Sequence, residues 1–506
     1  TISDNLCNGL GGGIHCHNKS NPDIFNCTIV RNTADHGGGV SCYENSNPVI
    51  TGCTIESNTA DSGGGISCYG SNPSISESMI QLNTANEEGG GITCYEYSSP
   101  TLTDCTIQNN TAQEGGGGIS TLSGSATLSG CMISGNTAEH GGGVDGYNSN
   151  FTITNCTIDA NTAVNGGGIY CQNSSNITIT DCSFTDNTAQ ETGGGIELED
   201  TTTAIFSGCT IEGNTATYIG GGVYCASSNL NLTKCIILNN TTEYGGGICC
   251  ENSNLFMMSC TISNNEADND YGGGGLRLLK SEATVFNCLF SKNRCTIGAA
   301  VMNESGHNLN TASRFVGCVF RENLGDISIV DIYDFGSRVS EFKECLFIDN
   351  NTTPTSSALR FYRSHGEVMN CSLINNYIGV NSYASTVKLD KCDIRLNTTG
   401  VLHVKESPNS GDLTVQDSRF CGQKVIDIQV DPIGADWIDK GGNVFLNTCH
   451  PCPGDANDDG FVDVDDVLLV ISTWNTLDPL ADFDDDGLVD ADDVLILLSS
   501  FGEACP

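Results

Sequence analysis

Apolar and polar residues alternate in short pieces that recur along most of the chain. The clearest copy is FTITNCTIDANTAVNGGGIYC, which runs from Phe151 to Cys171 and holds three such pieces. An apolar side chain at every second position is typical of β-strand, because alternate side chains point to one face. Each copy therefore predicts three short strands, with inward side chains at Phe151 and Ile153, at Cys156 and Ile158, and at Ile169 and Cys171.

The segment CTIVRNTADHGGGVSC, from Cys27 to Cys42, represents a motif that returns about every 26 residues. A period of this size indicates stacked supersecondary units instead of one globular core. Asn and Gly supply the left-handed backbone conformations that sharp corners need, and the glycine triplets exclude a helix. The motif asparagine recurs as Asn32, Asn58, Asn83, Asn110, Asn136, Asn161, Asn187, Asn214, Asn240 and Asn265.

Three strands per repeat, each lying on its counterpart in the next, make a parallel β-helix in which every coil buries its inner face against its neighbours. The prediction is an all-β fold of about sixteen coils, followed by a small all-α domain. Regular repeats are expected over residues 1–297, an irregular continuation of the β-helix over 298–450, and the C-terminal domain over 451–506. The glycine triplets end before Gly298, which sets the first boundary.

The pairing of GGG[VI] with [IF]xxN resembles the repeats of polymorphic outer-membrane proteins and related bacterial right-handed β-helix surface proteins. The second element becomes FTDN at Phe184, FSKN at Phe290, FREN at Phe320 and FIDN at Phe347. The resemblance covers residues 1–397 and implies a right-handed parallel β-helix. It says little about chemistry.

The charge of the chain limits the partners it can have. The 61 Asp and Glu residues outnumber 20 Lys and Arg, which gives a formal net charge of −41. So acidic a chain argues against nucleic acid and anionic membrane surfaces as partners. No apolar run is long enough to span a membrane, and Thr1 is not followed by a signal-peptide pattern. We expect a secreted protein whose leader peptide has been removed.

Most of the 28 cysteines fall into two columns. One column lies five residues before the motif asparagine, and the other follows the glycine triplets. Obligate disulfide partners would be lost together, yet Cys131, Cys156, Cys209 and Cys288 of the first column remain where the second column has lost its cysteine. We therefore expect mostly unpaired thiols that stack inside the coils as small apolar side chains. A bridge within one coil, such as Cys16 to Cys27, stays open.

Two acidic segments near the C-terminus fit a twelve-residue calcium loop: DANDDGFVDVDD from Asp455 and DFDDDGLVDADD from Asp482. Such a loop places oxygen ligands at positions 1, 3 and 5, a glycine at 6, an inward carbonyl at 7 and a carboxylate at 12. The pattern predicts two Ca²⁺ ions. The first ligand set is Asp455, Asn457, Asp459, the Phe461 carbonyl, Asp463 and Asp466, and the second is Asp482, Asp484, Asp486, the Leu488 carbonyl, Asp490 and Asp493.

A short amphipathic helix is expected after each loop, over Val464–Trp474 and over Ala491–Ser500. Their apolar faces, spaced i, i+4 and i+7, would pack against each other once calcium neutralises the loops. Without metal, so many like charges should keep the segment unfolded. The two faces are Val467, Ile471 and Trp474, and Val494, Leu498 and Phe501.

Paired loops with Asp at position 12 and little entering helix resemble a type I dockerin over residues 454–502. The resemblance implies calcium-dependent docking onto a cohesin module. Dockerins usually carry Ser or Thr at loop positions 10 and 11, where this chain has Val464 and Asp465, then Ala491 and Asp492. This departure puts an ordinary cohesin partner in question.

The layout is also similar to secreted repeat proteins of planctomycete-type bacteria, in which such a module ends the chain between cysteines. That likeness implies a disulfide between Cys452 and Cys505. Cys421 and Cys449 are then left as another candidate pair.

Asn-Xaa-Ser/Thr sequences are abundant, partly because the chain is rich in Asn and Thr. Outward-facing copies are candidate glycosylation sites. The candidates are Asn18, Asn109, Asn150, Asn173, Asn176, Asn231, Asn303 and Asn397.

Basic residues gather in the irregular coils, and Arg360, Arg363 and His365 form the one zone where a catalytic site could be argued. Right-handed β-helices include polysaccharide lyases and hydrolases, which need clustered carboxylates or carboxylates with calcium and a basic residue. The regular repeats present mainly Gly, Ser, Thr and Asn outside. We therefore expect no enzyme activity and keep a lyase or hydrolase as the alternative.

These observations together predict a structural or adhesive protein of a bacterial surface, assembled through its calcium module. The first coil begins without a capping helix, and an open strand edge invites pairing with another chain. The preferred partner is therefore a second copy, bound head to tail in a fibre. A cohesin-bearing protein is the alternative, and a polysaccharide is a further candidate ligand.

Overall fold

The computed structural model describes residues 1–173, 175–200, 202–270, 272–305, 312–334, 338–350, 353–406, 411–423, 426–430, 437–446, 464–474, 481 and 488–499. The fold is an all-β parallel β-solenoid of about 16 turns, as the repeat pattern predicts. Every strand pair with a described register is parallel, for example Ile29 opposite Ile55 in neighbouring coils. Three strands form the walls of each coil, and a short fourth strand joins them in part of the chain.

Strands at equivalent places in successive coils make up three long sheets and two short ones, of three and five strands, which isolated bridges connect and which are together called sheet 4. Sheet 1 precedes the motif asparagine and contains β1 (Ile2–Ser3), β4 (Thr28–Val30), β7 (Thr54–Glu56), β11 (Met79–Gln81), β15 (Thr106–Gln108), β19 (Met132–Ser134), β22 (Thr157–Asp159), β26 (Ser183–Thr185), β30 (Thr210–Glu212), β34 (Ile236–Leu238), β38 (Thr261–Ser263), β42 (Leu289–Ser291), β45 (Val319–Arg321), β48 (Leu346–Ile348), β51 (Ser372–Ile374), β54 (Asp393–Arg395), β57 (Arg419–Cys421) and β60 (Val444–Leu446).

Sheet 2 follows the glycine triplets. It contains β2 (Ile14–Cys16), β5 (Val40–Tyr43), β9 (Ile66–Tyr69), β13 (Ile92–Tyr95), β17 (Ile119–Leu122), β20 (Val144–Tyr147), β24 (Ile169–Gln172), β28 (Ile196–Leu198), β32 (Val223–Ala226), β36 (Ile248–Glu251), β40 (Leu276–Leu279), β43 (Ile297–Ser305), β46 (Ser328–Asp334), β49 (Ser357–Tyr362), β52 (Ile378–Tyr383), β55 (Thr399–Val404) and β58 (Ile426–Val430).

Sheet 3 precedes the column of cysteines that lies five residues before the motif asparagine. It contains β3 (Asp23–Phe25), β6 (Val49–Thr51), β10 (Ser74–Ser76), β14 (Thr101–Thr103), β18 (Ser125–Ser129), β21 (Asn150–Thr154), β25 (Asn176–Thr180), β29 (Thr203–Ser207), β33 (Asn229–Thr233), β37 (Asn254–Met258), β41 (Glu282–Phe286), β44 (Ser313–Val316), β47 (Val339–Lys343), β50 (His365–Met369), β53 (Thr386–Asp390), β56 (Leu413–Gln416) and β59 (Trp437–Asp439). Sheet 4 contains the short strands β8 (Thr59–Ala60), β12 (Thr84–Ala85), β16 (Thr111–Ala112), β23 (Thr162–Asn165), β27 (Thr188–Thr192), β31 (Thr215–Ala216), β35 (Thr241–Thr242) and β39 (Glu266–Ala267).

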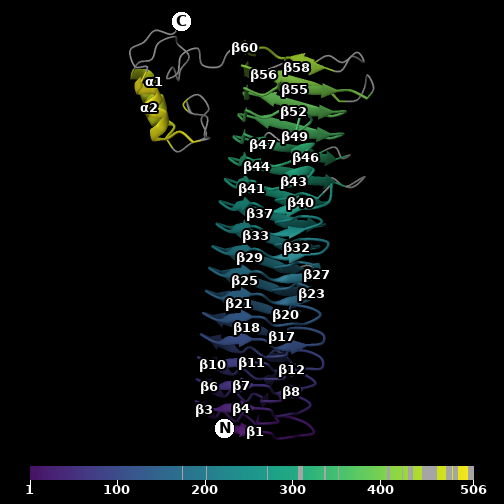
Figure 1. The fold of residues 1–506 in the computed structure, drawn as a ribbon, viewed down its shortest axis with the longest axis vertical. Coiled ribbons are helices and arrows are strands. Elements are labelled where there is room, and N and C mark those ends of the chain that lie inside the picture. The colour runs from purple at the N-terminus through teal and green to yellow at the C-terminus, as the bar shows by residue number, and fades with distance from the viewer. Residues whose placement is uncertain are drawn as a thin grey trace. The chain divides into compact units, whose positions relative to one another are not determined.

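The chain divides into two compact units. The first is Thr1–Phe256 with Ser263–Asp268, and the second is Met257–Ile262 with Asn269–Pro506. In the first unit the coils lie one upon the next with their strands in register (Figure 1). The predicted regions 1–297, 298–450 and 451–506 are not tested by this division and stay predictions.

Identical apolar side chains stack from coil to coil and form the core. In the first unit the central residue of sheet 1 is isoleucine in most coils, with Ile29, Ile55 and Ile80 fully buried. In the second unit Phe290, Phe320 and Phe347 hold the same place in three successive coils, and their rings stack, at 5.1 Å between Phe290 and Phe320. The predicted inward positions of the segment 151–171 are all buried. Because each coil is too thin to bury an apolar face alone, the stack itself supplies the core.

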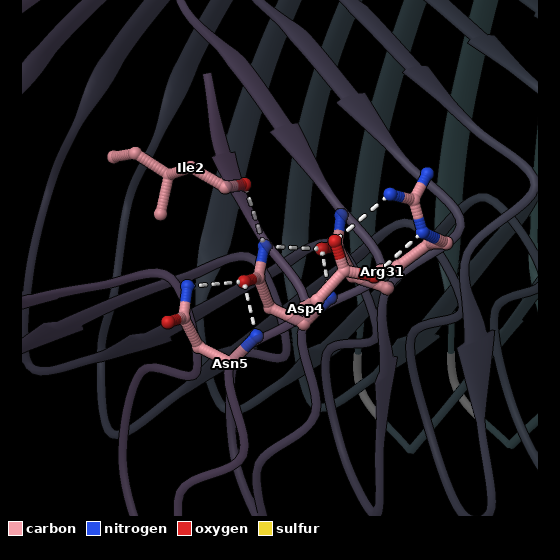
Figure 2. A network of polar contacts seen from close by, with 6 residues as sticks. Ile2, Asp4, Asn5 and Arg31 are labelled. Atoms are coloured by element: carbon pink, nitrogen blue, oxygen red, sulfur yellow. Dashed lines mark hydrogen bonds and ion pairs between the residues drawn. The ribbon is translucent and has the colours of Figure 1, made fainter.

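A column of buried asparagines closes the corner that follows sheet 1. Nδ2 of Asn58 donates to Oδ1 of Asn83 over 3.0 Å and to the carbonyl of Ile29 over 3.0 Å, while Oδ1 accepts from the backbone N–H of Asn32 over 3.0 Å. The arrangement begins in the first coil, where Asn32 bonds Asn5 and the Ile2 carbonyl, beside the exposed ion pair of Asp4 with Arg31 (Figure 2). Each amide therefore bonds atoms of neighbouring coils.

The motif asparagine is not the residue that takes the left-handed conformation at this corner. The residue before it does, as at Arg31 with φ 55° and Leu82 with φ 55°. The expectation that Asn supplies the bend is thus wrong for the motif position, because its buried side chain is engaged in hydrogen bonds between coils. It holds at other corners, such as Asn26 with φ 50° and Asn155 with φ 52°.

The glycine triplets are required by both conformation and space. The first glycine has a left-handed backbone, as at Gly37 with φ 67°. The second and third have no room for a side chain, because a Cβ on Gly38 would lie 2.5 Å from the Gly64 carbonyl oxygen and one on Gly39 would lie 2.6 Å from that of Gly65. Only glycine allows the coils to approach this closely.

Two helices, α1 (Val464–Ser472) and α2 (Ala491–Ser499), lie at the C-terminus. The predicted helices are confirmed, but the predicted contact face is partly wrong. Ile471, Trp474 and Leu498 are 58%, 43% and 55% exposed. The buried cluster instead combines Val470 and Leu497 with Ala481 and Val489, and Val467 and Val494 pack against it as expected. Ala481 and Val489 come before α2 in the chain. Val470 of α1 and Leu497 of α2 pack with them in one cluster, so these residues define the buried faces of the two helices.

Candidate functional site

Most of the predicted calcium ligands lie outside the described residues. These are Asp455, Asn457, Asp459, Phe461 and Asp463 of the first loop and Asp482, Asp484 and Asp486 of the second. Asp466 lies within α1, but its side chain is not among the described ones. Leu488, Asp490 and Asp493 are described, and they are the predicted ligands at positions 7, 9 and 12 of the second loop.

The described end of the second loop is folded back on itself. The side chain of Asp493, at position 12, is fully buried. Its Oδ2 accepts a hydrogen bond from the backbone N–H of Asp490 over 2.8 Å. This contact turns the carboxylate toward the start of α2, where the helix N-terminus favours negative charge.

Among the residues that the structure describes, no group of three His, Cys, Asp or Glu side chains is placed to hold a metal ion. The donor set that the second loop would supply, carboxylates with one carbonyl, is nevertheless the hard oxygen set that calcium takes. The described part fits it, because Asp493 places a buried carboxylate at the closing position.

The cysteines of the described residues, Cys421 excepted, are outside disulfide bonds, as the two-column analysis predicts. Cys16 and Cys27, the pair left open for a bridge within one coil, are both unpaired. Cys421 is disulfide-bonded. The proposed clasp of Cys452 with Cys505, and Cys449 as a partner of Cys421, lie outside the described residues.

The column of cysteines before the motif asparagine has a second role that the sequence does not show. The backbone N–H of Cys131 donates to Sγ of Cys156 over 3.3 Å, and this thiol donates to the Thr154 carbonyl over 3.3 Å. Where the column contains serine, the hydroxyl takes the same place, since the Cys53 N–H donates to Oγ of Ser78 over 3.1 Å. The thiols therefore close a corner as the asparagines do.

The candidate glycosylation sites differ in exposure. Asn18, Asn109, Asn150 and Asn176 are exposed, and Asn173 and Asn231 are half-buried. Asn303 and Asn397 are buried, with their Nδ2 atoms bonded to Ser313 Oγ over 3.1 Å and to the Leu373 carbonyl over 2.7 Å. The prediction that Asn303 and Asn397 are glycosylation sites is wrong, because the folded chain has no room for a glycan at either side chain.

The irregular coils bring Arg360 against a buried carboxylate. Nη1 of Arg360 lies 3.1 Å from Oδ2 of Asp331, which also accepts from the Ser328 hydroxyl over 2.7 Å. Burial raises the pKa of Asp331 above its ordinary value, although Arg360 opposes the shift. Its other oxygen, Oδ1, is buried and finds no hydrogen-bond partner within the described ranges.

A stack of tyrosines stands beside this ion pair. The rings of Tyr333, Tyr362 and Tyr383 lie 5.2 Å and 4.8 Å apart in three successive coils. Arg363 pairs with Glu406 at the surface and lies 5.4 Å from the Tyr362 ring. His365 begins β50 and is half-buried. The zone thus contains an acid, bases and aromatic rings, and the arginines are already paired with carboxylates.

A second polar row lies on the outer side of sheet 2 and was not anticipated from the sequence. Asp145, Tyr170 and Glu197 occupy register positions in three successive coils and are 7%, 5% and 2% exposed. Burial raises the pKa of both Asp145 and Glu197 to about 8. The Thr192 hydroxyl donates to Glu197 over 2.8 Å, and the Ser120 hydroxyl lies 3.4 Å from Asp145. At neutral pH these carboxyls are therefore largely protonated and uncharged.

Comparison with protein families decides where the chain belongs. A model described as "Right handed beta helix region" matches residues 1–104, 76–211, 117–290 and 187–320. The chain belongs to the right-handed β-helix family. The overlapping matches cover residues 1–320 of this β-helix.

Solved structures with some likeness to this β-helix include the Vag8–C1 inhibitor complex, at 10% identity over 88% of this chain and 100% of that chain, with a TM-score of 0.40. The periplasmic alginate epimerase AlgG matches at 10% identity over 80% of this chain and 77% of its own, with a TM-score of 0.25. The PL6 family alginate lyase AlyGC matches at 9% identity over 84% and 100%, with a TM-score of 0.16. Scores this low carry no argument about function.

The comparison with curated proteins gave no match for this β-helix. Within the described residues, its helices are all too short or too polar to span a membrane.

Proposed function

We propose that this β-helix protein is an extracellular, non-catalytic structural or adhesive protein whose C-terminal dockerin-like module binds two Ca²⁺ ions and engages a partner. The observation that carries the proposal is the buried carboxylate of Asp493, bonded to the Asp490 N–H at the end of a predicted calcium loop. Position 12 closes the oxygen shell of such a loop, so a Ca²⁺ ion held there would lie beside this carboxylate.

The solenoid supports the structural part of the proposal. Buried asparagine, cysteine and serine columns bond each coil to the next along three corners, as in the pairs Asn136 with Asn161, Cys131 with Cys156 and Ser149 with Ser175. Such a scaffold is stiff because neighbouring coils share both core packing and hydrogen bonds. It suits a protein that holds two partners at a fixed distance.

The preferred partner is a second copy of the chain, bound head to tail, and a cohesin-like protein is the alternative. Analytical ultracentrifugation of the full chain in calcium and in EDTA, at two protein concentrations, separates them. Growth of the particles with concentration in calcium, reversed by EDTA, supports self-assembly. Particles that stay monomeric in calcium contradict it, and a calcium-dependent pull-down with a cohesin domain then tests the alternative.

A paired variant controls for loss of charge. Asp466→Ala with Asp493→Ala removes both position-12 carboxylates, and Asp465→Ala with Asp492→Ala removes the neighbouring acids at position 11, which are not ligands in the predicted loops. The proposal expects assembly to be lost in the first pair and kept in the second. Equal behaviour of the two pairs would contradict the calcium role.

A carbohydrate-active enzyme is the second candidate, because Arg360 lies against Asp331, whose Oδ1 is buried without a described partner. Incubation with alginate, pectate and neutral glucans, followed by assays for unsaturated and reducing ends, tests it. Product release that disappears in Arg360→Ala would favour the enzyme over the structural protein.

A further inference from the structure

The cysteines that lie five residues before the motif asparagine form one column along the corner between sheets 3 and 1. This set is called the cysteine column below, and none of its members is in a disulfide bond. The column is interrupted at Ser78, whose Oγ accepts from the Cys53 N–H over 3.1 Å. It ends before Ser418, whose Oγ accepts from the Cys392 N–H over 3.1 Å. It therefore consists of a run of two and a run of twelve: Cys27 and Cys53, then Cys105, Cys131, Cys156, Cys182, Cys209, Cys235, Cys260, Cys288, Cys318, Cys345, Cys371 and Cys392.

Consecutive members of the column lie side by side in neighbouring coils. Thr106 is in register with Met132, so the cysteines just before these residues are neighbours as well. The backbone N–H of Cys156 donates to Sγ of Cys182 over 3.3 Å. Coils in register are about 4.8 Å apart, which lies within the range of about 4.4–6.8 Å between the Cα atoms of a disulfide. A bond between neighbouring thiols therefore needs only a small movement of the corner.

Hydrogen bonding alone does not explain why the column contains sulfur. Serine makes the same contact with the preceding coil at Ser78 and Ser418, so the corner also closes without a thiol. Both runs contain an even number of cysteines, so each member can pair with a neighbour in the adjacent coil and none is left over. In the long run this condition fixes the partners as Cys105 with Cys131, Cys156 with Cys182, Cys209 with Cys235, Cys260 with Cys288, Cys318 with Cys345, and Cys371 with Cys392.

The column lies directly below the surface of the solenoid. Cys131 is buried, whereas Gly130 and Met132 on either side of it are exposed. Hydrogen peroxide is little larger than water and can reach such a position, but a bulky oxidant such as oxidised glutathione cannot. Hydrogen bonds with the thiols of Cys105 and Cys156 lower the pKa of Cys131. This shift favours the thiolate, which is the form that attacks an oxidant.

We propose that the cysteine column is an oxidation site at which a peroxide joins the thiols of neighbouring coils in pairs and so links the solenoid covalently from coil to coil. In each pair one thiolate attacks a peroxide oxygen, the O–O bond breaks, and a sulfenic acid and hydroxide form. The second thiol attacks the sulfenic sulfur, an S–S bond forms, and the oxygen leaves as water. For each bond, two thiols lose two electrons and two protons, and one hydrogen peroxide becomes two waters.

The inference goes beyond the proposed function and does not involve the calcium module. Each bond closes a loop of about 26 residues, which removes conformational entropy from the unfolded chain. The oxidised chain should therefore unfold at a higher urea concentration than the reduced chain. The Cβ atoms of coils about 4.8 Å apart lie slightly beyond the separation of a relaxed disulfide, so a thiol reductant should readily reverse the change.

The test is oxidation of the folded full chain with hydrogen peroxide in EDTA, followed by removal of the peroxide, denaturation and alkylation of the remaining thiols. Peptide mapping without reductant should show links between Cys105 and Cys131 and between Cys156 and Cys182. The intact mass before alkylation should fall by about 2 Da for each bond. Oxidised glutathione in place of peroxide should leave these thiols unlinked.

Cys171 is an internal control. It belongs to the other column, and its register partners in the two neighbouring coils are Gly146 and Leu198, so it cannot pair with a neighbouring coil in this way. It should therefore be alkylated after peroxide treatment. Thiols of the cysteine column that stay alkylatable, oxidise to sulfinic acid without links, or link cysteines of distant coils would overturn the inference.

Two variants test the pairing itself, and both keep a hydroxyl that closes the corner as Ser78 does. Cys156→Ser leaves an odd run after it, so oxidation should leave one more alkylatable thiol than in wild type. Cys156→Ser with Cys182→Ser removes a whole pair and should leave no more alkylatable thiols than wild type. Equal numbers of alkylatable thiols in the two variants would contradict pairing between neighbouring coils. Loss of calcium-dependent assembly would not change any of these results.

Discussion

Nδ2 of Asn136 donates to Oδ1 of Asn161, one coil further along the chain, over 3.0 Å. The same Nδ2 reaches the Ile107 carbonyl of the preceding coil over 3.0 Å, and the Oδ1 of Asn136 accepts from the Asn110 backbone over 2.9 Å. One side chain thus bonds the coils before and after its own. A motif residue that looks like a turn former in the sequence is in fact a link between coils.

The first prediction concerns this link. Asn136→Ala leaves the buried N–H and Nδ2 of Asn110 without their acceptor and removes the side-chain bond to the Ile107 carbonyl, so the free energy of unfolding should fall by about 3 kcal/mol. Urea unfolding followed by circular dichroism measures it. Asn150→Ala, on the exposed side of β21, is the matched control and should cost less than about 1 kcal/mol. Equal losses of unfolding free energy in the two variants would show that the column of buried asparagines does not contribute more to stability than an exposed asparagine does.

The second prediction concerns the cysteine column. Cys156→Ser should be tolerated within about 1 kcal/mol, because Ser78 already fills an equivalent place and accepts from the Cys53 N–H over 3.1 Å. Cys156→Ala removes the acceptor for the Cys131 N–H and should cost about 1–2 kcal/mol more. The same urea titration measures both. A serine variant less stable than the alanine variant would mean that apolar packing of the thiol outweighs its hydrogen bonds.

The third prediction is a pH dependence from the buried carboxyls of sheet 2. Burial raises the pKa of Asp145 and of Glu197 to about 8 in the folded chain, above the ordinary values of 3.8 and 4.5. The folded chain therefore holds two protons that the unfolded chain releases. On account of these groups the free energy of unfolding is highest below pH 4 and falls as pH rises toward 8, by about 1 kcal/mol per pH unit for each group.

Asp145→Asn with Glu197→Gln imitates the protonated side chains and should flatten that slope. Unfolding titrations at several pH values between 5 and 8 measure it. Glu139→Gln, at an exposed carboxyl, is the control and should leave the slope as in wild type. An unchanged slope in the double variant would contradict the assignment.

The fourth prediction concerns metal. Calcium added to EDTA-treated protein should raise the helical circular dichroism signal and change the fluorescence of Trp474, which follows α1 and is 43% exposed. The reason is that α1 and α2 need neutralised loops before their apolar cluster can form. Asp493→Ala should weaken calcium binding at least about tenfold, and Asp492→Ala should not. If neither the circular dichroism nor the fluorescence spectrum changes when calcium is added, the assignment of the calcium loops is contradicted.

The sequence was most informative where one residue type serves one local requirement. The triplet at Gly37 predicts a tight corner because glycine alone accepts that backbone and that proximity. Alternation in the segment 151–171 predicts which side chains face inward, because a strand has two faces. The twelve-residue calcium frame is also local, since its ligands follow from position in the loop.

Properties that depend on neighbouring coils were not accessible in this way. Burial of Asn397 follows from its place in the asparagine column, although its local sequence reads as a glycosylation site. The raised pKa of Asp145 arises because packing around its strand excludes water. Likewise, Val470 and Leu497 are buried and Ile471 and Leu498 are exposed because the helices pack against Ala481 and Val489. These two residues lie outside the helices, so the helical period of the sequence does not predict the contact.

The amino-acid sequence by itself determined the solenoid, its repeat length and the inward residues of each strand, because all of these are set by conformational preferences within a single coil. Only the tertiary structure decided which polar side chains bond the coils together and which carboxyls hold a proton. The reason is that such properties belong to columns of residues about 26 positions apart, whose contacts arise only when the coils stack.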